Sequence, residues 1–281
     1  MMLFLTQWSA ELRKMIARKR TFLGFGAFVL LEIIIFWVLH LDKVENSFRR
    51  MIQRQGESFD SYFSALTLGV IVLIPIMLLS AVFITLVAGD VVAKESEDGN
   101  LRLILARPIS RFRLLLLKFL SCLVYSTVLM QFIAWTILLM GIFLRGWGGG
   151  LIMYFPDIQM LCLFDAGEGL QRYAYATIAL SLSMMGCSCV AFFLSCFRIK
   201  PAAATITALA YFFMDSVLRE GHFMDDYKYL LITNYMVSWR MVFFETIPWA
   251  VMAHNYAILG GVSLTLFVLG ALVFESRDLK S

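Results

Sequence analysis

Few side chains in this sequence have the type and the spacing that ATP chemistry requires. A phosphate-binding loop needs a lysine directly after a glycine, followed by serine or threonine, so that backbone N–H groups and the ammonium meet the phosphates together. No lysine follows a glycine anywhere in the chain. The sequence therefore predicts that this chain does not hydrolyse ATP, and that any ATP chemistry belongs to a separate protein.

The histidines and cysteines also lack the spacing of a catalytic or metal site. The zinc-protease pattern H-E-x-x-H is absent and no serine motif accompanies the histidines, so an intramembrane enzyme is not expected. Cys187 and Cys189 are two positions apart and point about 200° apart on a helix, so they are interpreted as packing residues and not as ligands of one metal ion. The number of cysteines is odd, and only Cys162 lies clearly outside an apolar run, so a disulfide framework is not expected either.

Glu32 is the one acidic residue deep inside an apolar run. Ionisable groups inside a membrane are costly and usually face protein or water. Glu32 is therefore a candidate residue of a substrate pathway, with a purely structural pairing to another helix as the open alternative.

The elements that would hold these residues are membrane-spanning helices. Hydrophobic residues make up 60% of the chain and charged residues 16%, and the mean hydropathy is +0.80, all far from the averages of a soluble domain. A span takes about 20 mostly apolar residues, and six runs provide them: 21–41, 66–88, 114–144, 173–197, 201–218 and 249–274. The predicted fold is an all-α membrane protein with six transmembrane helices in a single domain, 1–281, in which nucleic acid is not an expected partner.

The distribution of lysine and arginine predicts the orientation. Most of these residues lie in the segments that share a membrane side with the N-terminus, and basic residues mark the cytoplasmic side. Both termini are therefore expected in the cytoplasm. No small-residue cleavage pattern follows the first run, so that run is expected to remain as a span and not to act as a signal peptide.

Three segments outside the runs have an apolar stripe or unusual aromatic content. Residues 1–20 predict an amphipathic helix in the cytoplasmic interface, with a simple extension of the first span as the alternative, and residues 43–55 predict a short helix at the outer surface. Residues 145–171, with GWGGG and Pro156, predict an irregular loop. Residues 219–248, which include Trp239, predict an outer reentrant helical segment, with an aromatic belt as the equal alternative.

Residues 89–113 contain the most elaborate polar connection. Glu95, Glu97 and Asp98 close a cytoplasmic extension of the second span, and Gly99 is a natural helix end. Asn100 can cap a new short helix, which Pro108 would end because the residue before it, Arg107, is pushed out of the helical region. Ser110 can cap the third span.

The predicted short helix places Leu101, Ile104 and Leu105 on one face. An apolar face with a charged rim, held outside the membrane, suits a groove on a soluble protein. The alternative is a helix lying flat on lipid, which the neighbouring acidic residues disfavour because anionic headgroups repel them.

At these positions the sequence resembles the ABC-2-type permeases, the membrane subunits of ATP-binding-cassette exporters. The resemblance rests first on the order of residues in this connection: an acid, a Glu, a Gly with a capping residue, Pro-x-Ser-Arg, and a lysine in the next span. It rests also on the tail after the sixth span. Asn100 stands where many members of the family have Thr. The residues are Asp90, Glu95, Glu97, Gly99, Asn100, Leu101, Pro108, Ser110, Arg111, Lys118, Phe274, Arg277 and Asp278. The order of the elements also fits, so the resemblance covers nearly the whole chain.

The resemblance implies a non-catalytic permease subunit of an exporter in a bacterial-type cytoplasmic (inner) membrane. Its coupling helix would lie on a separate ABC ATPase subunit, which binds ATP and magnesium, while this chain has no cofactor of its own. A second permease copy, or a homologous permease, would complete the transport path. The coupling residues would be Glu95, Glu97, Asn100, Leu101, Ile104, Leu105 and Arg107, and the pathway candidates are Glu32 and Trp239. The alternative function is an ATPase-independent membrane scaffold or a secondary transporter.

Overall fold

The computed structural model describes residues 2–39, 41, 63–99, 109–155 and 160–276. The predicted coupling helix, the predicted outer helix at 43–55 and the tail from Arg277 onward lie outside these residues. Within the described residues, six helices are long and apolar enough to cross a membrane, which confirms the six predicted spans. They are α2 (Lys19–Leu39), α5 (Ala65–Glu97), α7 (Arg111–Arg145), α8 (Ala166–Ser195), α9 (Pro201–Glu220) and α11 (Trp249–Glu275).

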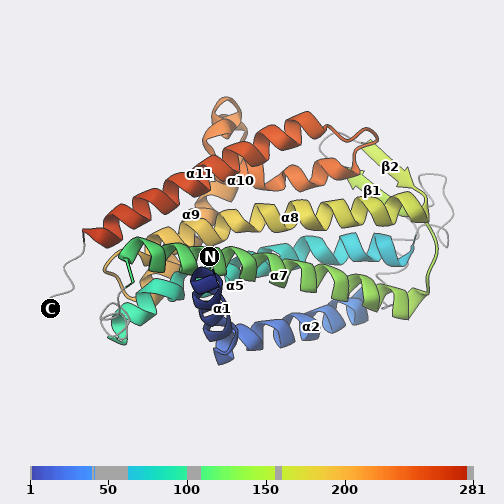
Figure 1. Ribbon diagram of the computed structural model, residues 1–281. Helices are drawn as coiled ribbons and strands as arrows, with labels where there is room; N and C mark the ends of the chain where they lie inside the picture. Colours follow the sequence, from blue (N-terminus) through green and yellow to red (C-terminus); the bar gives the residue numbers. More distant parts are fainter. Residues whose placement is uncertain (1, 40, 42–62, 100–108, 156–159, 277–281) are drawn as a thin grey trace.

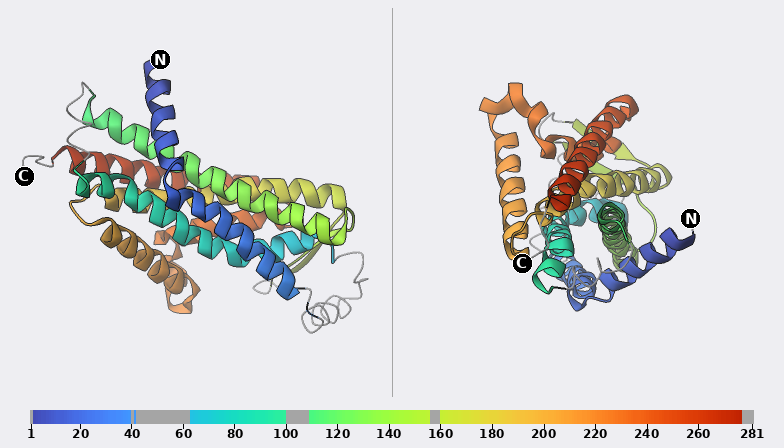
Figure 2. Two further views of the ribbon diagram at one scale, coloured as in Figure 1. Left: turned by 90° about the horizontal axis from the view of Figure 1, so that it is seen from below. Right: turned by 60° about the vertical axis from the view of Figure 1, so that its left-hand side comes forward.

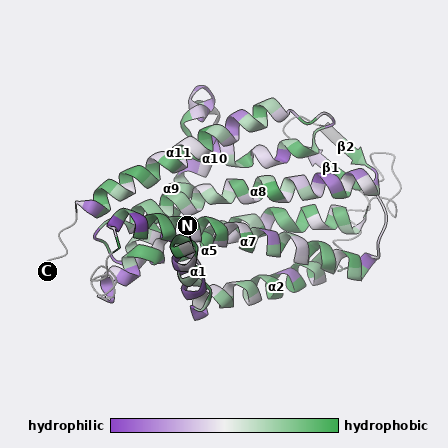
Figure 3. Cartoon of the chain, viewed as in Figure 1, coloured by the Kyte–Doolittle hydropathy of each residue, from purple (hydrophilic) through white to green (hydrophobic). Residues whose placement is uncertain are grey.

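The six helices form one elongated bundle with α8 at its centre (Figure 1). Helix α8 packs against α5, α7, α9 and α11, and 72% of its most apolar window is buried, against 22% for α9. Hydrophobic residues cover the long helices and hydrophilic residues gather toward their ends (Figure 3). The bundle therefore has the pattern of a protein whose middle is surrounded by lipid.

The N-terminal segment forms helix α1 (Met2–Ile16), as its apolar stripe predicts. The chain turns at residues 17 and 18, and α1 runs across the direction of the long helices (Figure 2, left). It packs against α7 and α2. This crossing is the orientation expected of a helix in the membrane interface, and that location remains a prediction.

Helices α5 and α7 are unusually long, with 33 and 35 residues. At a rise of about 1.5 Å per residue each exceeds the roughly 30 Å of hydrocarbon, so each projects beyond it. Ser110 begins α7, since its hydroxyl accepts a hydrogen bond from the backbone N–H of Arg113 at 3.3 Å. Gly99 follows α5 with a φ of 72°, which glycine adopts without steric cost. The predicted cap and helix end are both confirmed.

The segment 145–171 is not the irregular loop that its glycines and proline predict. Strands β1 (Leu151–Phe155) and β2 (Met160–Phe164) pair antiparallel, with Met153 opposite Cys162. The hairpin is fixed to the start of α5 because the Ser64 hydroxyl donates to the Gly150 carbonyl at 2.6 Å, and the Ile152 amide donates to the Thr67 hydroxyl at 3.0 Å. The two short apolar runs pair with each other and are anchored at the start of α5, and local turn signals show neither contact.

Between α9 and α11 the chain forms three short helical pieces: η2 (His222–Leu230), α10 (Ile232–Met236) and η3 (Val237–Phe243). The piece η3 packs against α8, and α10 packs against α9 and α11. Asp215 of α9 holds the start of α10, since its carboxylate accepts a hydrogen bond from the Thr233 amide at 2.7 Å. How deep these pieces lie in the membrane remains a prediction.

Candidate coupling site

A group of charged side chains joins three helices at the end of the bundle where α5 finishes and α7 begins. Lys118 of α7 lies 2.6 Å from the carboxylate of Glu95 on α5 and 3.0 Å from that of Glu11 on α1. Glu95 also pairs with Lys14 of α1, and with Arg18 just after α1 at 3.4 Å. These five residues are called the coupling cluster below.

The centre of the coupling cluster is buried. The side chains of Lys118 and Glu95 are exposed by only 2% and 3%, whereas Lys14 and Arg18 reach the surface. A buried charge is tolerated only when partners offset its loss of hydration. Lys118 has two carboxylates and Glu95 has three cations, so neither buried charge is left alone.

The coupling cluster lies where α5 ends and α7 begins, on either side of the connection between them. Glu95 lies in the last turn of α5, and Lys118 lies two turns into α7, so their ion pair holds together the two helices that this connection joins along the chain. Helix α1 is fixed to the same point through Glu11 and Lys14. A displacement of this connection would therefore move α1, α5 and α7 together.

The residues expected to couple to a partner have different positions in the structure. Glu97 is exposed, so it is accessible to a partner. Glu95 is buried within the chain's own ion pairs, so any part it has in coupling is to position helices and not to contact another protein. The remaining five, Asn100, Leu101, Ile104, Leu105 and Arg107, lie outside the described residues. Sequence reasoning missed Glu11, Lys14 and Arg18 as partners, although the lysine inside an apolar run was a signal that a buried carboxylate must exist.

Glu32 is fully buried between α2 and α7. Its Oε1 accepts a hydrogen bond from the Thr136 hydroxyl at 2.9 Å, while Oε2 has no hydrogen-bond partner among the described residues. The interhelical partner that the structural alternative requires is therefore present. A contact between Glu32 and substrate stays a prediction.

Trp239, the second pathway candidate, is also fully buried. It lies on η3, edge to face with Phe243 at 6.3 Å between ring centroids, and η3 packs on α8. Within the described chain it packs between helices, and its role in a pathway remains a prediction.

At the opposite end of the bundle, Arg172 binds the end of η3 and the residues that follow it. Its guanidinium donates to the carbonyls of Val242 at 2.8 Å and of Glu245 at 3.0 Å, and also to that of Phe244 at 2.5 Å. Its Nε donates to Glu168 at 2.8 Å, one turn earlier on α8. The planar fork of arginine thus satisfies three carbonyls at a helix end. From the sequence alone, Arg172 is only a basic residue beside a predicted loop, and its carbonyl partners cannot be inferred.

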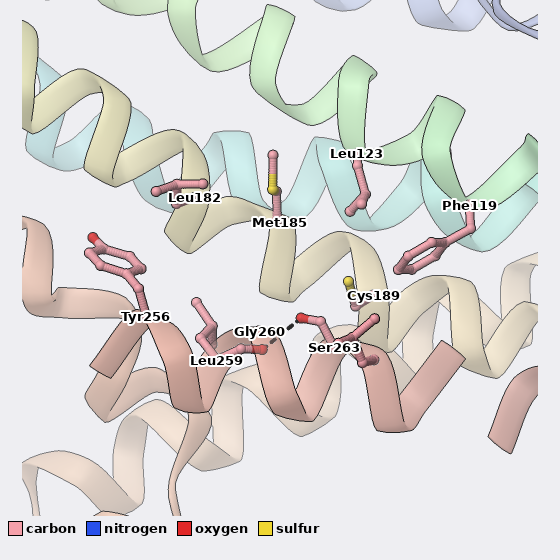
Figure 4. Close-up of a pocket in the computed structure, with 10 residues that line it drawn as sticks. Phe119, Leu123, Leu182, Met185, Cys189, Tyr256, Leu259, Gly260 and Ser263 are labelled. Carbon is pink, nitrogen blue, oxygen red and sulfur yellow. Dashed lines mark hydrogen bonds between the residues drawn. The ribbon is translucent and has the colours of Figure 1, made fainter. Parts of the chain in front are cut away.

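An apolar pocket of about 260 Å³ lies between α7, α8 and α11 (Figure 4). The polar groups in its wall are already bonded within the chain: Ser263 donates to the Leu259 carbonyl at 2.8 Å and Tyr256 to the Ala179 carbonyl at 2.8 Å. Cys189 lines the pocket beside aliphatic and aromatic neighbours, where it acts as an apolar residue. The pocket therefore suits an apolar group. The lining residues are Phe119, Leu123, Leu182, Met185, Cys189, Tyr256, Leu259, Gly260, Ser263 and Leu264.

A comparison with known protein families finds a family whose model matches this chain. The model of a family described as "ABC-2 family transporter protein" matches residues 8–215, a range that begins in α1, contains the coupling cluster and ends in α9. A comparison with curated proteins finds no match. Because the family match covers well over half of the chain and agrees with the motif order and the six spans, the chain belongs to the ABC-2 transporter family and is a multi-pass permease component of an ABC transporter.

Proposed function

We propose that this chain is the permease subunit of an exporter and that a separate ATPase chain, bound at the connection between α5 and α7, drives it. The observation that carries the proposal is the buried ion pair between Glu95 and Lys118, which holds both ends of that connection and fixes α1 to them. A connection that transmits force from a partner needs ends that are held together in this way. ATP and magnesium are then bound by the partner and not by this chain.

The geometry gives a physical route for the motion. Helices α5 and α7 run from the coupling cluster to the opposite end of the bundle, where Ser64, just before α5, is bonded to Gly150 and Thr67 of α5 to Ile152 of the β-hairpin. Breaking a buried ion pair is strongly unfavourable, so α5 and α7 respond to a force on the connection as one unit. Movement generated by ATP binding on the cytoplasmic side would in this way reach the outer segments.

A second permease copy, or a homologous permease, completes the proposed transporter. Helix α9 is the least buried of the six spans, and its exposed apolar side chains have no partner helix within the described chain. The exposed side chains are Ile206, Phe213, Met214 and Val217. An interface on α9 would place the transport path between two copies. The apolar pocket beside α8 supports an apolar substrate class, and outward direction follows from the resemblance to exporters.

Purification in mild detergent from the native membrane tests the proposal. An ABC ATPase subunit is expected to co-purify with the chain in stoichiometric amount, and the complex is expected to hydrolyse ATP. Recovery of the intact chain without any ATPase, at a detergent concentration that preserves other ABC transporters, would overturn the proposal. It would leave the scaffold or the secondary transporter as the function.

A further inference from the structure

A second, polar pocket of about 280 Å³ lies where α1 turns into α2, beside α5. Arg18, Lys19 and Lys94 bring three positive charges to its wall, and Asp90 brings one negative charge. Lys19 and Lys94 form no ion pair or hydrogen bond with any described residue, so their charges are not already neutralised within the described chain. Arg18 is already paired with Glu95, so the two lysines, against the one carboxylate of Asp90, give the pocket a net positive charge.

Thr21 provides an independent sign that the pocket is built for a ligand. It is only 2% exposed and lines the pocket, yet its hydroxyl makes no hydrogen bond to any described residue. A threonine in a helix can bond to a carbonyl one turn earlier, and Thr21 forms no such bond to the described residues before it, so its hydroxyl stays open to the pocket and can donate to a bound anion. The pocket also lies at the N-terminus of α2, where the helix dipole favours an anion.

The walls of the pocket change in character along α5. Leu86 and Val87 are apolar and lie toward the middle of the helix, whereas Asp90 and Lys94 follow one and two turns closer to the end that carries the coupling cluster. The basic residues are thus expected at the level where lipid headgroups meet water, and the apolar residues on the side of the hydrocarbon. A free inorganic anion needs only the basic part of the pocket, whereas an anionic lipid uses the basic part and the apolar part together.

We propose that this pocket binds the phosphate group of an anionic phospholipid, with Lys19, Lys94 and Thr21 as its ligands and Leu86 and Val87 against its glycerol and upper acyl region. The bound lipid would lie between the α1–α2 turn and α5, next to Arg18, which also belongs to the coupling cluster. The site does not depend on ATPase binding, so it can be tested on the purified chain alone.

Binding is measured on the full chain in mild detergent by native mass spectrometry and thermal unfolding, with phosphatidylglycerol, phosphatidylcholine and inorganic phosphate as probes. Phosphatidylglycerol is expected to bind more tightly than phosphatidylcholine. Lys19→Gln with Lys94→Gln is expected to weaken its binding by about thirtyfold, from the attraction of two basic residues to an anionic headgroup. Lys19→Arg with Lys94→Arg keeps the charges and is expected to retain most of the binding.

The matched control is Arg198→Gln with Lys200→Gln, which removes two exposed positive charges after α8, at the cytoplasmic side of the expected topology. Phosphatidylglycerol binding is expected to be unchanged in this control. Thr21→Val, which keeps all charges, is expected to weaken binding by about fivefold through loss of one hydrogen bond. Equal losses in the two glutamine pairs, no preference over phosphatidylcholine, or inorganic phosphate binding as tightly as phosphatidylglycerol would each overturn the lipid site.

Discussion

The ammonium of Lys118 lies 2.6 Å from the carboxylate of Glu95, and both side chains are almost completely buried. The pair joins α7 to α5 across a connection whose sequence resembles that of the ABC-2-type permeases. Such a pair is expected to act on both stability and coupling, because removing either partner leaves a buried charge with fewer counter-charges.

Lys118→Met is expected to lower the free energy of unfolding by about 3 kcal/mol or more, since Glu95 loses its buried partner. In Lys118→Met with Glu95→Gln the loss is expected to be clearly smaller than the sum of the single losses, because the two residues interact directly. Thermal or denaturant unfolding in detergent measures both. Lys200→Met, at an exposed position, is the control and is expected to change little. Additive losses would contradict the pairing.

Leu101→Asp with Leu105→Asp is expected to abolish ATPase association while leaving membrane insertion intact, because two charges would replace the apolar face that is proposed to fill a groove on the ATPase. Co-purification and membrane fractionation measure the two properties. Ile199→Asp, at an exposed aliphatic residue in the connection between α8 and α9, is the matched control and is expected to retain the ATPase. Normal association of the double variant would place the docking surface elsewhere.

Glu32→Gln is expected to leave stability within about 1 kcal/mol of the wild type and to leave transport unchanged, because glutamine can still accept the hydrogen bond from Thr136. Thr136→Val is expected to be the more disruptive change, since it leaves the Glu32 carboxylate buried without its hydroxyl partner. Unfolding and transport assays on both variants compare the two. A well-folded Glu32→Gln protein that no longer transports would show instead that Glu32 contacts substrate.

Arg172→Lys and Arg172→Ala are both expected to loosen the segment after η3, because an ammonium cannot reproduce the planar fork that reaches three carbonyls. Hydrogen exchange of residues 237–245 is expected to become at least tenfold faster, while exchange in α5 stays the same. Glu168→Gln is the control, since it alters only the half-exposed partner of Arg172, and such a pair contributes about 1 kcal/mol or less. Unchanged exchange in Arg172→Lys would mean that charge alone holds the segment.

Gly260→Leu is expected to fill the apolar pocket and to reduce the binding of apolar ligands at least tenfold without unfolding the protein. A side chain at Gly260 meets no atom within 4 Å of its Cβ, and the residue lines the pocket. Gly261→Leu is a closely matched control, because Gly261 has the same free space but does not line the pocket. Equal effects of the two changes on ligand binding would exclude the pocket as the binding site.

Much of this architecture could be predicted because the membrane imposes a local rule. Each span must satisfy its own backbone hydrogen bonds and cover them with apolar side chains, so length and hydropathy alone locate six helices. Helix ends are local too: Ser110 caps α7 within three residues, and Gly99 ends α5 through its own backbone freedom.

The sites depend on contacts that no local pattern contains. Lys118 and Glu11 are 107 positions apart, and Glu32 and Thr136 are 104 positions apart. The β-hairpin is likewise attached to α5 through Thr67, 85 positions before Ile152, whose hydroxyl accepts the Ile152 amide.

The sequence by itself determined the six spans, their order and the Ser110 cap at the start of α7, since these follow from the solvent and from neighbouring residues. Only the tertiary structure decided which buried charge meets which partner. Glu95 illustrates the difference: by sequence it belongs to an exposed acidic connection, and by structure it is the buried counter-charge of Lys118. A charged side chain in a low-dielectric interior is stable only where the fold brings an opposite charge to it, and distance along the chain does not reveal that partner.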